Sequence, residues 1–300
     1  MKTTILLGVL VLFVACSEAK DDNTASSDVD IINTSEMSID SVLPNNLEVE
    51  INDSLSSVLS SDTTIDEIES NVLSESELQN IPVVDFHQYQ AFSKFLSAHV
   101  SLNGNVNYKK IKSDIGELNT IIEEFKSNTP QDNWSRNEKL SYWINAYNLF
   151  TLKLVTDNYP INSITSITAK PWDKKFIQLQ GKTLSLNDIE HSIIRATYNE
   201  PRIHFALNCT SESCPQLLNV AFTPNQLSAQ LTRQTKLFLD DPSRNDFSNP
   251  NSIKISQLFD WYRSDFERGG SLIDFINKYR TEKLGAPNID YLEYSWDLND

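Results

Sequence analysis

The residues of this chain best suited to covalent chemistry gather in one stretch, residues 202–215. It holds His204, one of only four histidines, together with Cys209 and Cys214, two of the three cysteines. An apolar run, residues 203–207, precedes the first cysteine and has the length of a β-strand. We therefore expect a strand that delivers a thiol to a turn just ahead of a helix, where unpaired N–H groups and the helix dipole favour a thiolate. The two cysteines also fit a disulfide, and both interpretations stay open at this point.

Geometry limits how this stretch can act. If the chain ran straight as one strand, the His204 ring and the Cys209 sulfur would lie about 17 Å apart on opposite faces. A thiolate–imidazolium pair therefore requires a sharp turn near Asn208, or else the histidine serves a site built by another element. Cys214 competes for the role of nucleophile, because the residues on either side of it resemble the start of a helix.

A buried carboxylate is predicted on the helix expected over residues 185–198, which begins with an S-x-x-D capping pattern. At 100° per residue, Glu190 falls in the middle of the apolar face, whereas His191 and Arg195 fall on the opposite side. A carboxylate that faces the interior alone is costly, so Glu190 either forms an ion pair or faces a site. We expect His191 to lie at the rim.

Two amides lie on the longest predicted helix, residues 137–159, whose apolar stripe is wide. Asn145 and Asn148 are three positions apart on or beside its buried surface, and a buried amide must find hydrogen-bond partners. They either tie loops to the core or orient a catalytic group or substrate.

The N-terminus predicts export. Residues 1–16 combine Lys2 with an apolar run that is too short to span a membrane, which is typical of a signal peptide. The run ends in Phe13-Val14-Ala15-Cys16, which resembles a bacterial lipobox, so we expect a lipid anchor on Cys16; ordinary secretion with a chance cysteine is the alternative. Cys209 and Cys214 would then be the remaining thiols, in an oxidising compartment.

An acidic tether is expected between the leader and the folded part. Residues 17–80 contain no Phe, Trp or Tyr, and residues 21–80 carry fifteen acidic residues and no Lys or Arg. Such a segment cannot bury enough apolar surface to offset its ordering entropy. Most of the net charge of −16 therefore lies in this tether, no basic surface is implied, and we expect no nucleic-acid partner.

Residues 81–300 are predicted to form a single α+β domain, mostly helical with a small antiparallel sheet. Helical periodicity and punctuation by Gly and Pro predict further helices over residues 89–100, 111–125, 224–239, 256–266 and 272–279. Short strands are expected at residues 164–167, 176–179 and 183–184, and alternation predicts a half-buried strand at residues 291–298.

Five motifs occur in order from about residue 86 to the C-terminus: Tyr142-Trp143-Ile144-Asn145-Ala146-Tyr147-Asn148, Leu186-Asn187-Asp188-Ile189-Glu190-His191 with Arg195, residues 202–215, Phe259-Asp260-Trp261-Tyr262 with Asp265-Phe266, and residues 291–299. Together they resemble the bacterial domain-of-unknown-function 547 family. The resemblance implies a Cys-Glu-His set, with Cys209 as nucleophile, His204 as base and Glu190 as its orienter, and a rearranged papain-like or transglutaminase-like core.

The leading functional hypothesis is an envelope lipoprotein that acts as a cysteine hydrolase or acyl transferase on amide or peptide bonds, on the periplasmic or surface side of the outer membrane. Backbone N–H groups near Thr210 and Ser211 would supply the oxyanion hole. The main alternative is a non-catalytic ligand- or partner-binding lipoprotein with a Cys209–Cys214 disulfide. Zinc binding by His204 and the two cysteines, and thiol redox chemistry, are weaker alternatives because the spacings are unusual. We expect no cofactor and no resident metal.

Overall fold

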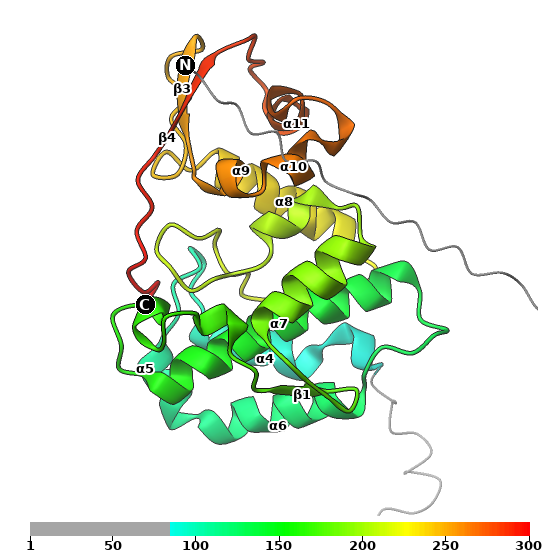
Figure 1. The fold of residues 1–300 in the computed structure, drawn as a ribbon. Helices are drawn as coiled ribbons and strands as arrows, with labels where there is room; N and C mark the ends of the chain where they lie inside the picture. Colours follow the sequence, from blue (N-terminus) through cyan, green and yellow to red (C-terminus); the bar gives the residue numbers. More distant parts are fainter. Residues whose placement is uncertain (1–84) are drawn as a thin grey trace, which may run out of the picture. The chain divides into compact units, whose positions relative to one another are not determined.

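Helix α7 (Arg136–Asn158) is the element around which the first half of the described chain is arranged (Figure 1). Its N-terminus is a capping box, in which the Ser135 hydroxyl accepts from the Glu138 N–H at 3.2 Å and the Ser135 N–H donates to the Glu138 carboxylate at 2.6 Å. Nearly every residue from Leu140 to Thr156 is buried, so α7 is enclosed on all sides. The helix predicted over residues 137–159 is confirmed.

The computed structural model describes residues 85–300. The predicted signal peptide with Cys16 and the predicted tether of residues 17–80 lie outside these described residues. Residues 85–300 belong to one compact unit. Among residues 85–300, none of the helices combines the length and the apolar character that crossing a membrane requires.

Two helices, α5 (Tyr108–Ser113) and α6 (Ile115–Ser127), pack on α7, and a third, α4 (Gln90–His99), packs on these two, with aromatic rings between the helices. Phe125 lies at the centre of these rings, in contact with Phe86, Tyr89 and Phe92. The single helix predicted over residues 111–125 is in fact two, because the chain bends at Asp114, whose carboxylate is bound by the buried His99 ring at 2.8 Å.

A second apolar cluster forms around Phe205, which is completely buried. It is enclosed by four helices and a parallel strand pair, drawn in yellow to red in Figure 1. The helix predicted over residues 256–266 is broken into two short ones at Tyr262. The elements are α8 (Leu227–Leu239), α9 (Leu258–Trp261), α10 (Arg263–Phe266), α11 (Leu272–Tyr279), β3 (Ser252–Ile255) and β4 (Asn288–Tyr291).

The predicted antiparallel hairpin is confirmed. Strands β1 (Ile177–Leu179) and β2 (Lys182–Leu184) pair antiparallel, and Gln180 and Gly181 make the turn with φ of 53° and 70°. Two consecutive left-handed residues are the turn chemistry that matches the twist of a two-residue hairpin. Helical elements with these small strand pairs make the fold α+β, as predicted.

Two of the predicted strands are replaced by 3₁₀ helices. Residues 164–166 and 203–205 belong to the 3₁₀ helices Ile164–Ser166 and Pro201–Phe205 (η5), and residues 167, 206 and 207 follow them without forming a strand. The buried apolar residues of α4 to α7 form a first apolar cluster, to which the side chain of Ile203 in η5 also belongs. The side chain of Phe205 in η5 belongs to the second cluster. A segment buried on both sides is apolar without a period, so its sequence looks like a short buried strand.

The C-terminal segment runs from β4 back to the α7 region (Figure 1). The strand predicted over residues 291–298 is wrong: strand β4 ends at Tyr291, and the residues after it make separate backbone contacts instead of a strand. The Leu298 N–H donates to the Asn162 carbonyl at 2.8 Å, and the Asn299 carbonyl accepts from the Val106 N–H at 2.8 Å. This segment therefore connects the two apolar clusters.

Candidate functional site

An asparagine of α7 holds the loop that follows η5. The Asn148 amide donates to the Ala206 carbonyl and accepts from the Asn208 N–H, both at 2.9 Å. The Asn208 side chain in turn accepts from the Thr210 N–H at 2.9 Å. The Asn148 amide thus pairs with one backbone acceptor and one backbone donor, as the backbone of a neighbouring strand would. These contacts hold a turn at Asn208, where a pair between His204 and Cys209 requires one.

Thr210 has a φ of 68°, in the left-handed region that β-branched residues seldom adopt. Its N–H is bound to Asn208, and its carbonyl accepts from the Asn299 N–H at 3.0 Å, so contacts on both sides maintain the strained conformation. Strain of this kind clusters at functional sites. One sequence prediction is corrected here: the Thr210 N–H is already bonded and does not serve an oxyanion hole.

Asn145 makes the same type of contact one helical turn earlier. Its amide donates to the Phe222 carbonyl at 2.8 Å and accepts from the Phe222 N–H at 2.9 Å. Of the two interpretations of Asn145 and Asn148, the structure therefore supports the tying of loops to the core.

Replacing Asn148 by alanine is expected to lower the free energy of unfolding by about 1–3 kcal/mol, because a buried backbone donor and acceptor lose their partner. Urea unfolding measures the loss. Asn137→Ala is the matched control, since this exposed asparagine of the same helix makes a single 3.3 Å bond to a carbonyl. Equal losses for the two variants would contradict the positioning role of Asn148.

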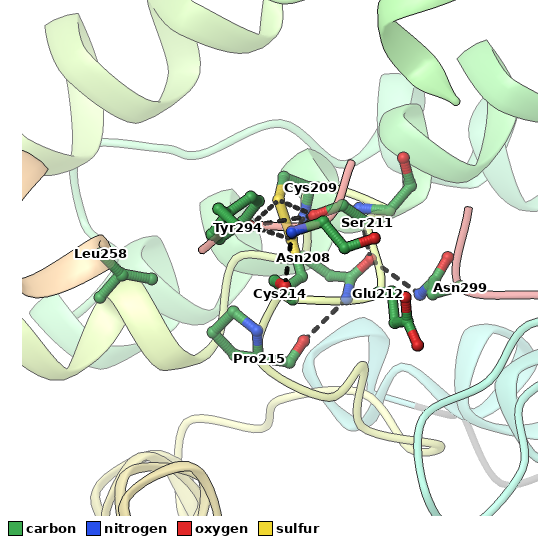
Figure 2. The surroundings of a disulfide bond; sticks show 12 residues. Asn208, Cys209, Ser211, Glu212, Cys214, Pro215, Leu258, Tyr294 and Asn299 are labelled. Carbon is green, nitrogen blue, oxygen red and sulfur yellow. Dashed lines mark hydrogen bonds between the residues drawn. A yellow bond between two sulfur atoms is a disulfide. The ribbon is translucent and has the colours of Figure 1, made fainter. Parts of the chain in front are cut away.

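Cys209 and Cys214 form a disulfide, with Cα atoms 6.0 Å apart (Figure 2). The sulfur of Cys214 is buried and accepts from the Cys209 N–H at 3.0 Å. The predicted helix start at these cysteines is wrong, because the backbone here pairs with the C-terminal segment, as in the 2.7 Å bond from the Glu212 N–H to the Asp297 carbonyl. The next helix along the described chain is α8, so neither cysteine lies at the start of a helix.

Two hydroxyls lie beside the Cys209 sulfur (Figure 2). The Tyr294 hydroxyl is 3.1 Å from it, the Ser211 hydroxyl is 3.3 Å from it, and the two are 2.9 Å apart. Burial raises the pKa of Tyr294 to about 12, so this hydroxyl keeps its proton at neutral pH. Both groups can donate a hydrogen bond to a thiolate or to an oxyanion that forms next to it.

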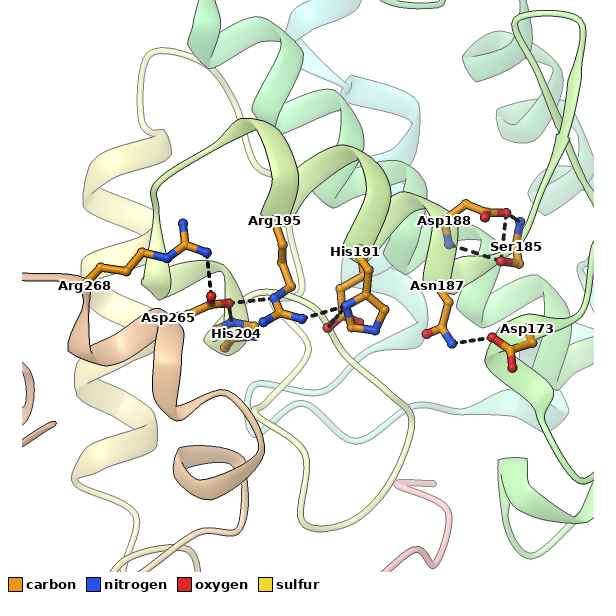
Figure 3. Close-up of polar contacts among 10 residues, drawn as sticks. Asp173, Ser185, Asn187, Asp188, His191, Arg195, His204, Asp265 and Arg268 are labelled. Carbon is orange, nitrogen blue, oxygen red and sulfur yellow. Dashed lines mark hydrogen bonds and ion pairs between the residues drawn. The ribbon is translucent and has the colours of Figure 1, made fainter. Parts of the chain in front are cut away.

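His204 is buried in η5, and its ring stacks on Tyr262 with centroids 3.8 Å apart. The Nε2 atom is 2.8 Å from the Asp265 carboxylate (Figure 3). Because an ionised carboxylate can only accept, Nε2 carries the ring proton and Nδ1 keeps its lone pair. Burial lowers the pKa of His204, although the Asp265 bond opposes it. The ring is therefore neutral at pH 7 and can accept a proton at Nδ1.

Asp265 is the anchor of this polar cluster (Figure 3). Besides His204 it binds Arg195 and Arg268, each at 2.6 Å, and its side chain is only 7% exposed. Burial by itself would raise the pKa of Asp265, but the hydrogen bonds from His204 and Arg195 and the charge of Arg195 outweigh burial and hold this pKa well below 3.8. Arg195, placed away from the core by periodicity, thus reaches a buried carboxylate with its guanidinium.

Glu190 lies in η4 (Asp188–Arg195), a π-helical segment of the kind often found at functional sites. As predicted, its residue faces inward, 5% exposed, while the neighbouring His191 is exposed. Within residues 85–300 the Oε1 atom of Glu190 has no hydrogen-bond partner. The His191 Nδ1 atom lies 3.8 Å from it but is 2.9 Å from the Arg195 guanidinium, so it acts as an acceptor there.

Glu190, His204 and Cys209 line one cavity of about 180 Å³. The structure therefore brings together the three residues of the predicted set, although the carboxylate bound to the histidine is that of Asp265. Asn145, Asn148, Arg195 and Cys214 are not part of the wall. The rest of the wall is largely aromatic and includes Tyr147, Trp172, Trp261, Tyr262, Tyr294 and Trp296.

The zinc hypothesis finds no support in the described part of the chain. Among residues 85–300, no group of three or more His, Cys, Asp and Glu side chains is arranged to hold a metal ion. The two sulfurs of the hypothetical zinc set are bonded to each other.

Asp265 and the aromatic wall are the parts that sequence reasoning missed. Asp265 is separated from His204 by 61 positions and lies on a one-turn helix, so no local periodicity connects the two residues. The available signal was the motif around residues 259–266, in which an acid follows three aromatic residues.

Comparison with known families gives one match. Residues 131–239 match the family described as "Protein of unknown function, DUF547". This confirms the predicted resemblance over a range that contains Glu190, His204 and Cys209 but ends before Asp265. Comparisons with curated proteins and with solved structures give no match.

Proposed function

Starting from a chain whose residues 131–239 match that family of unknown function, we propose that the protein is a cysteine hydrolase or acyl transferase that cleaves amide or peptide bonds. The observation that carries the proposal is the single cavity lined by Cys209, His204 and Glu190. Asp265, which fixes the His204 ring with Nδ1 unprotonated, adds the orienting group that such a base requires.

The proposed reaction uses Cys209 as nucleophile and His204 as base. The Cys209 thiol gives its proton to Nδ1 of His204 while its sulfur bonds to the carbonyl carbon, and the amine leaves with that proton. Water then attacks the thioester and gives a proton to His204. The carbon–sulfur bond breaks, a carboxylic acid is released, and the proton returns to the sulfur. An amine or alcohol in place of water makes the step an acyl transfer.

The disulfide makes this activity conditional. Cys209 cannot attack a carbonyl while it is bonded to Cys214. A dithiol reductant would supply two electrons and two protons, yield both thiols, and itself become a disulfide. Ser211 and Tyr294 would then be the donors nearest the freed sulfur.

Paired serine variants test the proposal in the full chain with Cys16→Ser as background. After reduction, the Cys214→Ser protein is expected to hydrolyse p-nitrophenyl acetate and to carry an acetyl group on Cys209, measured by absorbance and peptide mass spectrometry. Cys209→Ser should give only background hydrolysis. His204→Gln should slow turnover by about 10²–10⁴-fold. Equal background rates for the two serine variants would overturn the hydrolase.

A second candidate function is favoured by the disulfide itself. In this case the protein is a non-catalytic binding protein in which the Cys209–Cys214 bond is permanent and holds the wall of the cavity. Inactivity of both serine variants, together with ligand binding by the oxidised chain, is the result that favours this function over the hydrolase.

For either function we propose an envelope location, with the chain anchored by a lipid on Cys16. The lipobox-like residues 13–16 at the end of the apolar leader support it. Cells expressing the chain are expected to incorporate labelled palmitate into it, and the Cys16→Ser variant is expected to incorporate none. Equal labelling of both proteins would contradict the anchor.

A further inference from the structure

The cavity contains a buried acceptor without a partner. Glu190 is 5% exposed, its Oε1 atom makes no hydrogen bond within residues 85–300, and its side chain lines the cavity. Buried polar atoms are nearly always paired, since leaving one unpaired costs free energy. An unpaired carboxylate oxygen at a cavity wall is therefore an acceptor that a ligand can use.

The basic side chains near Glu190 form hydrogen bonds with other residues. Arg195 donates to Asp265 at 2.6 Å and to His191 at 2.9 Å, and Arg268 donates to Asp265. Because the His191 Nδ1 atom accepts from an arginine, this ring is neutral when so bonded. The negative charge of Glu190 thus lacks a bound cation among the described residues.

Two tyrosines that line the same cavity, Tyr147 and Tyr262, carry neutral hydroxyl groups. Burial, followed by the charge of Glu190, raises the pKa of Tyr147 and of Tyr262, so both phenols stay protonated. These phenols can donate hydrogen bonds, but being neutral they do not compensate the negative charge of Glu190. A positively charged group of a ligand would compensate it.

The wall of the same cavity includes aromatic rings. Trp296 stacks on Trp261 at 5.8 Å and also contacts Trp172 at 5.4 Å and Tyr294 at 4.7 Å. Trp261 is 47% exposed, so this aromatic group reaches the surface. Aromatic faces attract cations through their quadrupole, and aromatic cages recognise ammonium groups.

We propose that this cavity is an ammonium-binding subsite, in which Glu190 pairs with a positively charged amino group of the ligand and the tryptophan faces cover its apolar stem. The volume of about 180 Å³ fits one side-chain-sized group, since a cavity of about 150 Å³ accommodates benzene. The inference concerns binding alone. Together with the proposed hydrolase, on which this extension rests, it gives the substrate class as amides that carry an amino group.

Binding of small amines by the oxidised full chain with Cys16→Ser tests the subsite. n-Butylamine at pH 7 is expected to quench tryptophan fluorescence saturably, and the uncharged n-butanol to bind at least about tenfold more weakly. Glu190→Gln should remove this preference for the amine, whereas the exposed Glu293→Gln should keep it. Equal affinity for amine and alcohol, an unchanged Glu190→Gln protein, or no binding of butylamine would each overturn the subsite.

A second variant guards against misfolding of Glu190→Gln. Trp261→Leu changes a half-exposed ring, keeps an apolar surface and should fold. It is expected to weaken the binding of butylamine and of butanol, because both share the stem that the ring covers, and to keep the preference for the amine; unchanged binding of both ligands would contradict the role of the tryptophan faces. The two proposals can be overturned independently. Acetylation of Cys209 without amine binding would overturn the subsite proposal alone, and amine binding without acetylation would overturn the hydrolase proposal alone.

Discussion

Replacing Asp265 by alanine is expected to lower the free energy of unfolding by about 3–5 kcal/mol, because removing one partner of a buried ion pair leaves the other charges uncompensated. The carboxylate is 7% exposed and binds Arg195, Arg268 and His204 at 2.6, 2.6 and 2.8 Å. The variant would leave two guanidinium groups without their acceptor and release the histidine ring. Urea unfolding at pH 7 measures the loss, with the disulfide intact in both proteins.

Asp290→Ala is the matched control for this experiment. Asp290 is an exposed aspartate of β4, so its removal should change the free energy of unfolding by less than about 0.5 kcal/mol. Asp265→Asn, which keeps the shape without the charge, should fall between the two. If Asp265→Ala were as stable as the control, Asp265 would not be the anchor of the cluster.

Acid should reduce the contribution of Asp265 in a predictable direction. Its folded-state pKa is held below the ordinary 3.8, so the ionised carboxylate contributes its full stabilisation above pH 3.8. Below that pH the unfolded chain takes up a proton that the folded chain does not, and the contribution is lost as the pH falls through the folded-state pKa. The difference between wild type and Asp265→Asn is therefore expected to narrow below pH 3.8.

The helices were the most predictable part of the fold, because an apolar stripe with a polar cap is a local signal. Helix α7 was found from its stripe, and α11 from helical periodicity that begins just after Gly269 and Gly270. Glu190 was placed inward correctly although the segment is π-helical. It lies only a few residues after Ser185, whose hydroxyl accepts from the Asp188 N–H at 3.1 Å, and over so short a distance the two helix types diverge little.

Short buried segments were not predictable in the same way. Pro201–Phe205 sits between the two apolar clusters, and burial on both sides removes the period that distinguishes a strand from a 3₁₀ helix. In the C-terminal segment, residues 292–298 alternate between apolar and polar types without forming a strand. The alternation still places Tyr294 and Trp296 on the same side, because both line the cavity.

The site was predictable as a set of residues but not as a network. The resemblance placed Cys209, His204 and Glu190 together, and the cavity contains all three. It assigned the bond to the histidine ring to Glu190, whereas the ring is bound by Asp265 from a distant short helix. Such a contact depends on how α10 packs on η5, which no local pattern in the sequence encodes.

Phe205→Ala is expected to lower the free energy of unfolding by about 3–5 kcal/mol, the usual cost of a cavity left by a buried aromatic ring. Phe205 is completely buried at the centre of the second apolar cluster. Its ring lies 5.1 Å from Phe238, 5.7 Å from Phe266 and 5.9 Å from Phe259. Because these rings come from separate helices, the surroundings cannot easily collapse into the space.

The same substitution tests whether the second cluster supports the site, because Phe205 follows His204 directly in η5. Phe205→Leu refills part of the cavity and should lose less stability than alanine. Leu237→Ala removes a 39% exposed side chain from α8 and should cost less than about 0.5 kcal/mol. If Phe205→Ala lowered the free energy of unfolding no more than Leu237→Ala, the second cluster would be able to repack around the missing ring. The packing of α10 against η5 could then not be what holds Asp265 against the His204 ring.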